Sequence, residues 1–132
     1  MIVNGEVELG LELSAEGLAQ LHMRQELAVA AARTYLSAGF AVIYQDIVIG
    51  PDLERVAGML GPGTRIVVLC PSAETLATRE AGRAKSGYSR DFTPDAFDRI
   101  FRERTPRLGL WLDTTAMTVA ETVDAILAAH PA

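Results

Sequence analysis

The sequence has few of the features that stabilise or localise a small protein by means other than packing. Its single cysteine, Cys70, cannot form a disulfide within the chain or supply a cysteine-rich metal site. Its longest apolar stretches, residues 40–49 and 66–70, fall far short of the roughly 20 residues that a membrane-spanning helix needs. The first residues lack the basic segment and the long apolar segment of a signal peptide. We therefore expect a cytoplasmic protein without a membrane-spanning segment, stabilised by its packed core.

The sequence also lacks an excess of basic residues. Its 12 Lys and Arg stand against 17 Asp and Glu, which gives a formal net charge of −5. This balance argues against a general attraction to nucleic acid or to anionic lipid, so neither is an expected partner. Hydrophobic residues, by contrast, make up 49% of the 132 residues, which suits a single globular domain spanning residues 1–132.

Helix signals divide the chain into short regular segments. Ser14, Ser72 and Thr93 stand as N-caps before apolar residues at helical spacing, and Thr118 with Glu121 makes a complete capping box. Glycine or proline follows most of these patterns. The signals predict helices over residues 14–38, 52–60, 72–83 and 94–105, and a last helix after Thr118.

Three apolar runs between these helices are predicted strands, at residues 40–49, 65–70 and 108–112. The first run is apolar on both of its alternating faces, which is typical of a strand that helices cover on both sides. Helices and strands alternate along the chain, and this order indicates an α/β fold with a parallel sheet and right-handed crossovers.

Polar residues follow these elements in a recognisable order. One strand ends in Gln45-Asp46, a helix runs into Arg79-x-x-x-Arg83-x-Lys85, and the last strand ends in Asp113-Thr114-Thr115. In this order the segments resemble the later half of a P-loop kinase, and from Leu18 onward the chain is similar to the chloramphenicol-phosphotransferase-like group. The resemblance implies a three-layer parallel sheet of the P-loop NTPase kinase type. It also implies Mg²⁺-assisted transfer of a phosphoryl group from ATP to a hydroxyl of a small-molecule acceptor.

The resemblance assigns Asp46 to the magnesium ion. Asp46 lies at the carboxyl end of a predicted strand, where open parallel sheets bind their ligands, and a carboxylate there can hold Mg²⁺ through water. The alternative is that Asp46 only caps the turn before Gly50-Pro51.

The basic group Arg79, Arg83 and Lys85 corresponds to the lid of the resembled kinases, where it has the catalytic role of binding the transferring phosphoryl oxygens. Arginines four residues apart share one face of a helix, which suits this role. The alternative is a solvated basic face with Glu80 as a local partner.

The resemblance places Asp113 and Thr114 beside the adenine base, as cofactor-binding residues that act mostly through their backbone. The alternative is that they only build the turn into the last helix. We expect Asp46 and the basic group to form two halves of one nucleotide pocket.

The phosphate-binding loop G-x-x-x-x-G-K-[ST] is absent from the sequence. Without its amides, lysine and hydroxyl, affinity for ATP and Mg²⁺ should be poor, and the kinase is expected to be incomplete or inactive as given. The missing first strand would leave two sheet edges open, so we expect either a start upstream of Met1 or a shortened chain that rearranges or recruits another chain to cover those edges. The alternative function is a non-catalytic α/β remnant that binds a partner or forms a homodimer. A flavodoxin- or receiver-like domain fits the alternation alone.

Overall fold

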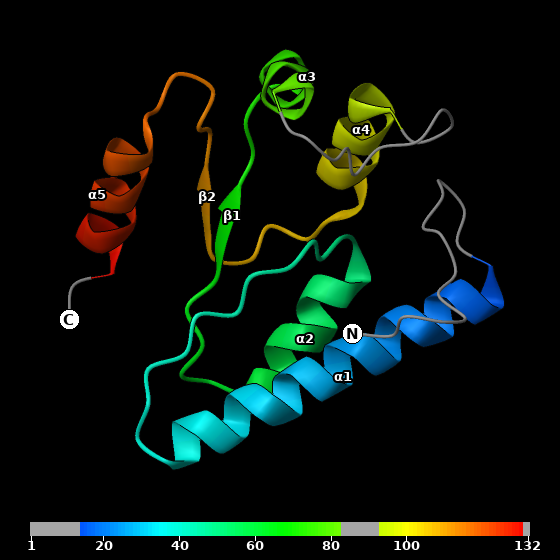
Figure 1. Cartoon of the computed structure of the whole chain (residues 1–132), viewed down its shortest axis with the longest axis vertical. Coiled ribbons are helices and arrows are strands. Elements are labelled where there is room, and N and C mark those ends of the chain that lie inside the picture. Colours follow the sequence, from blue (N-terminus) through cyan, green and yellow to red (C-terminus); the bar gives the residue numbers. More distant parts are fainter. Residues whose placement is uncertain (1–13, 83–92, 131–132) are drawn as a thin grey trace.

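The computed structural model describes residues 14–82 and 93–130. In these ranges the chain forms five helices and two short strands (Figure 1). Their order is α1 (Ala15–Ser37), α2 (Pro51–Leu60), β1 (Val67–Leu69), α3 (Ala73–Ala81), α4 (Pro94–Arg104), β2 (Leu110–Leu112) and α5 (Val119–Ala129). The predicted α/β class is confirmed, and each predicted helix is present. No helix in these ranges combines the length and apolar character needed to cross a membrane.

Four helices begin at the N-caps that the sequence predicts. The side chains of Ser14, Ser72 and Thr93 each accept a hydrogen bond from a first-turn amide, at 3.0, 3.2 and 3.3 Å. Thr118 and Glu121 form the full capping box at the start of α5. These local bonds satisfy amides that have no partner within the helix, which explains why the helix starts are where the sequence places them.

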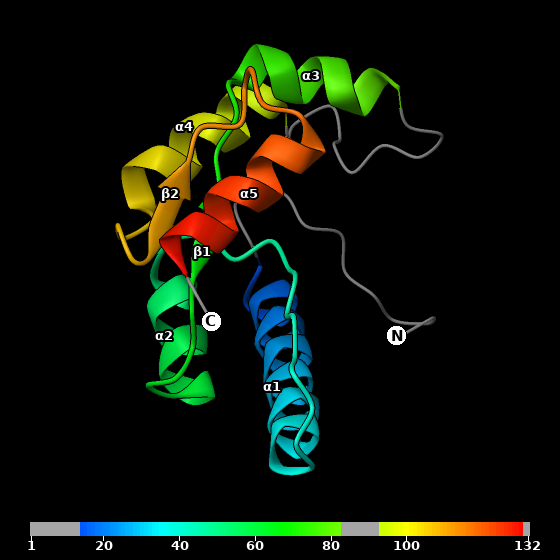
Figure 2. The same cartoon turned by 90° about the vertical axis from the view of Figure 1, so that its left-hand side faces the viewer.

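β1 and β2 form a parallel pair in which Val68 lies opposite Trp111. On one side of the pair α4 packs through Phe101, whose ring centroid lies 5.3 Å from that of Trp111. α5 lies on the opposite side (Figures 1 and 2). Gly109, directly before β2, has a positive φ of 73° and lies against the backbone of Ile66.

The prediction of a strand over residues 40–49 is wrong. These residues are extended, but none of them belongs to the sheet or makes a ladder with another described segment. The side chain of Ile43 is 96% exposed and that of Ile47 is 66% exposed, whereas Tyr44 and Asp46 turn towards α1. An extended apolar run becomes a strand only beside a neighbouring strand, and the described residues supply none here. The sheet therefore has two strands and is not the expected three-layer sheet.

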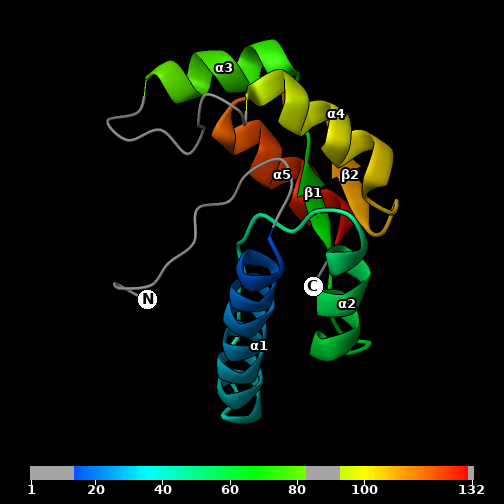
Figure 3. The same ribbon diagram turned by 90° about the vertical axis from the view of Figure 1, so that its right-hand side faces the viewer.

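α1 and α2 pack side by side, away from the strand pair (Figures 2 and 3). Val29, Ala32 and Val56 form their buried apolar contact surface. The amide of Gly50, before α2, donates a buried hydrogen bond of 2.9 Å to Oγ1 of Thr105, after α4. This bond links the α1–α2 pair to the part of the chain that carries the sheet.

Candidate functional site

The candidate site lies where β1 and β2 end, which is the edge at which parallel sheets bind ligands. Ser72 follows β1 as the N-cap of α3, and Thr114 and Thr115 follow β2. The amide of Ser72 donates a hydrogen bond of 2.8 Å to Oγ1 of Thr115. This bond joins the two strand-end loops into one surface.

The structure brings together two of the predicted site residues, Arg79 and Thr114. Arg79, in the last turn of α3, donates from Nη2 to the carbonyl oxygen of Thr114 at 2.9 Å. Its Nη1 lies 3.5 Å from Oγ1 of the same residue. Thr114 is only 3% exposed, so the guanidinium is held against a fixed backbone group. These bonds attach α3, the predicted lid, to the loop after β2, which was predicted to lie beside the adenine base.

The side chain of Asp113 takes part in the turn after β2. Its Oδ1 accepts from the amide of Thr115 at 3.0 Å and from the Thr115 hydroxyl at 2.5 Å. These two bonds stabilise the carboxylate and lower its pKa, and Arg102 adds a smaller effect in the same direction. The observed contacts of Asp113 are those of a turn-forming residue, and its predicted role at the adenine base remains a prediction.

A pocket of about 410 Å³ opens beside these loops. This volume lies in the range of small-molecule sites, which is roughly 300 to 1,000 Å³. Each residue that lines the pocket has a polar side chain, and together they supply hydroxyls, one cation and one carboxylate, from Ser72, Glu74, Thr75, Thr78, Arg79 and Thr115. Such a lining can donate hydrogen bonds to phosphate or sugar oxygens.

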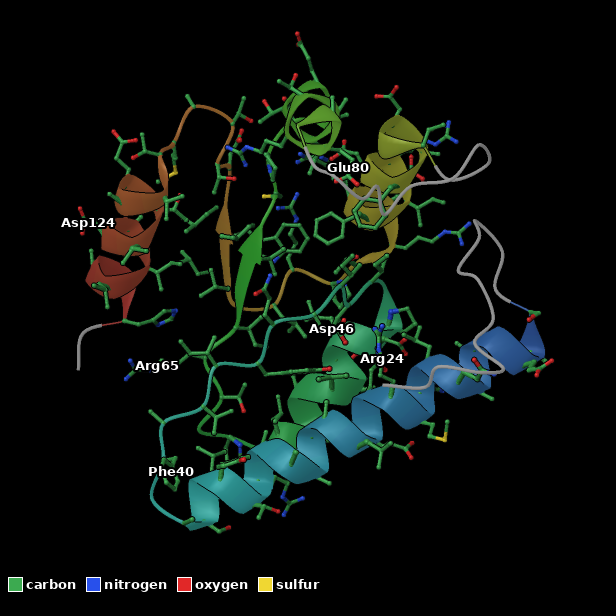
Figure 4. The ribbon with its side chains drawn as sticks, viewed as in Figure 1. Arg24, Phe40, Asp46, Arg65, Glu80 and Asp124 are labelled. Atoms are coloured by element: carbon green, nitrogen blue, oxygen red, sulfur yellow. The ribbon has the colours of Figure 1, made fainter. Side chains whose placement is uncertain are left out.

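Asp46 is bound to α1. Its carboxylate accepts from Nη2 of Arg24 at 2.9 and 3.0 Å, from the hydroxyl of Tyr44 at 3.0 Å and from the amide of Ile47 at 2.8 Å (Figure 4). Burial of the phenol is the largest cause, and the hydrogen bond to Asp46 the second largest, of a rise in the pKa of Tyr44 to about 12. A magnesium ion at Asp46 would have to compete with the Arg24 guanidinium. No group of three potential metal-ligating side chains occurs in residues 14–82 and 93–130.

The structure does not bring Asp46 and Arg79 into one pocket. The segment that carries Asp46 ends at Gly50, which bonds to Thr105 on the side where β2 begins. Arg79 instead contacts Thr114, on the side where β2 ends. The two residues therefore lie near opposite ends of the short sheet. Two other members of the predicted site, Arg83 and Lys85, lie outside the described residues.

No motif in the sequence points to the pocket hydroxyls or to the Arg24 partner of Asp46. Ser72 was visible only as an N-cap, and Thr115 only as the last residue of the Asp113-Thr114-Thr115 run at the end of a strand. Arg24 and Asp46 are separated by 22 positions, so no local pattern points to their pairing. In the comparisons with known proteins, no protein family, curated protein or solved structure matches this chain.

Proposed function

We propose that this chain contributes the lid and the base side of an ATP-dependent small-molecule phosphotransferase of the P-loop kinase type. The observation that carries the proposal is the contact of Arg79 with Thr114 beside a hydroxyl-lined pocket. This contact joins α3, which carries Arg79, to the end of the last strand, and these two segments resemble the lid and the adenine loop of such kinases.

The side chains that line the pocket are suited to only part of the proposed phosphoryl transfer. Arg79 uses two of its nitrogen atoms on Thr114, and its other N–H groups are available for phosphoryl oxygens. The phosphate-binding loop does not occur in these 132 residues, so the triphosphate needs a loop from outside them. The chain alone should bind ATP weakly, and transfer should require that loop.

The metal role of Asp46 belongs to the completed site. In the resembled kinases a central strand lies between the strands that correspond to residues 40–49 and to β1. Pairing with such a strand would draw residues 40–49 alongside β1 and carry Asp46 to the edge where Arg79 lies. The ion pair with Arg24 would then open, and the carboxylate would be free to bind Mg²⁺ through water.

Nuclear magnetic resonance of the labelled chain, titrated with ATP and Mg²⁺, tests the proposal. We expect shift changes concentrated at Ser72–Thr78 and at Thr114 and Thr115, and a weaker response in Arg79→Met. Arg99→Met, which removes an exposed arginine of α4, is the matched control and should respond as the parent chain does. Shifts that are absent, or equal in both variants, would contradict the assignment of the pocket.

A second candidate function is that of a non-catalytic interaction domain. It is favoured by the large apolar side chains that the structure leaves exposed, among them Ile43, Ile47 and Leu69 of the extended segment and β1. Another polypeptide that added a strand there would bury them and pair the free backbone groups. Hydrogen exchange tests this idea, because edge pairing between chains predicts that residues 41–49 become protected as the protein is concentrated. Equal exchange rates in dilute and concentrated samples would exclude such pairing.

A further inference from the structure

Helix α1 has apolar residues on two opposite faces. Its inner face, with Val29 and Ala32, is buried against α2. On its outer face Leu27 is 64% exposed and Met23 is 43% exposed. A helix that is apolar on both faces usually packs on both, and within the described residues the helix that packs extensively on α1 is α2, on the inner face.

The outer face has the spacing of a helix-pairing seam. Met23, Leu27, Ala30 and Thr34 follow one another at steps of four, three and four residues, which is the pattern of coiled-coil core positions. Small residues follow Leu27 in this row, so a second helix can approach closely. Arg24 and the extended segment bound to it lie at one flank of the row.

The other flank carries one charge of each sign. Glu26 and Arg33 are both exposed and stand seven residues apart, so they lie on the same side of the seam. Two copies of such a helix that pair in antiparallel orientation are related by a twofold axis. This axis places Glu26 of each helix beside Arg33 of the other, so that opposite charges face each other. The face is therefore complementary to itself.

We propose that α1 is a homodimerisation surface that pairs, antiparallel, with α1 of a second copy of this chain. Leu27 of each copy packs beside Ala30 of the other, Met23 packs beside Thr34, and two Glu26–Arg33 pairs close the flank. Glu26 lies 3.6 Å from Arg55 of its own chain, and as a 63% exposed side chain it remains accessible to a second partner. The proposal does not depend on the phosphotransferase function.

The charges on the two helices favour homodimerisation through α1 over homodimerisation through α5. The α5 helix also exposes an apolar row, Val119, Val123 and Leu127. Its charged residues, however, are Glu121 and Asp124, and Val119–Ala129 contains no Lys or Arg. A twofold axis through α5 would place like charges together, whereas one through α1 places opposite charges together.

Sedimentation of the whole chain, from about 5 to about 500 µM, tests the proposal. We expect a reversible dimer that Leu27→Asp weakens by more than about tenfold, because pairing would bury an unpaired carboxylate. Val123→Asp, an equivalent change on the exposed row of α5, is the control and should leave the dimer intact. Circular dichroism and thermal melting of both variants show that the monomer still folds.

A charge exchange tests the antiparallel register. Glu26→Arg and Arg33→Glu should each weaken the dimer, and the double variant should restore it. A chain that stays monomeric, a dimer that Leu27→Asp leaves intact or a dimer that Val123→Asp disrupts would overturn the α1 surface. A double variant no stronger than the singles would overturn the register. None of these outcomes bears on nucleotide binding at the Arg79 pocket.

Discussion

Replacing Gly109 with alanine should destabilise the chain strongly. At this glycine, the residues that directly precede β2 contact the residues that directly precede β1. A Cβ atom at Gly109 would lie 2.3 Å from the carbonyl oxygen of Ile66 and 2.6 Å from its Cβ. The φ of 73° adds about 1 to 2 kcal/mol for a residue other than glycine. To relieve this clash, the backbone must shift and the 2.9 Å hydrogen bond from the Leu110 amide to Ile66 must lengthen. These changes cost about 1 to 3 kcal/mol more. We expect a total loss of about 2 to 5 kcal/mol, from a stability that for a domain is about 5 to 15 kcal/mol.

Urea unfolding of Gly109→Ala, beside two other glycine variants, measures this loss. Gly58, inside α2, has nothing within 4 Å of its added Cβ, so Gly58→Ala should stabilise by about 0.5 to 1 kcal/mol through helix propensity. Gly39 has equal space but a φ of 89°, so Gly39→Ala isolates the backbone cost of about 1 to 2 kcal/mol. If Gly109→Ala costs no more than Gly39→Ala, the close approach to Ile66 is refuted, and the β1–β2 register with it.

Three further results are expected. Thr115→Val should raise the pKa of Asp113, because the lost hydroxyl is the largest cause of its lowering; carbon NMR titration measures it. Since this folded-state pKa is lowered, the carboxylate adds stability above its unfolded pKa and loses it as the pH falls through the folded value. Asp46→Asn should lower the pKa of Tyr44 from about 12, measured by ultraviolet titration, because the bond to a carboxylate favours the protonated phenol. Thr118→Ala should cost about 1 kcal/mol in thermal or urea unfolding, because α5 loses its N-cap.

The helices were predictable because their start signals are local. A Ser or Thr N-cap bonds to an amide three residues later, so the pattern that predicts it and the bond that stabilises it occupy the same short segment. The bounds of α1, predicted as 14–38 and observed as Ala15–Ser37, differ by one residue at each end.

The strands were less predictable because a strand is defined by its neighbour. Residues 40–49 have the composition of a buried strand, yet in the structure they lie along α1, with Asp46 fixed to Arg24. Sequence shows which run is apolar, but it does not show whether a partner is available to pair with it.

The candidate site was predictable only in part for the same reason. Arg79 and Thr114 were named separately, from a helix and from a strand end, and their contact spans 35 positions. The distance between Asp46 and that contact depends on how the α1–α2 pair is placed against the sheet. Resemblance suggested one pocket, whereas the bond from Gly50 to Thr105 places Asp46 at the other end of the strands.

Calorimetric titration of the purified chain with ATP and Mg²⁺ determines whether the pocket beside Arg79 is one side of a nucleotide site that lacks its phosphate anchor. We expect weak but measurable binding, with a Kd of about 1 mM, because these residues contain no G-x-x-x-x-G-K-[ST] loop to offset the charge of the triphosphate. Micromolar binding by these 132 residues alone would contradict it.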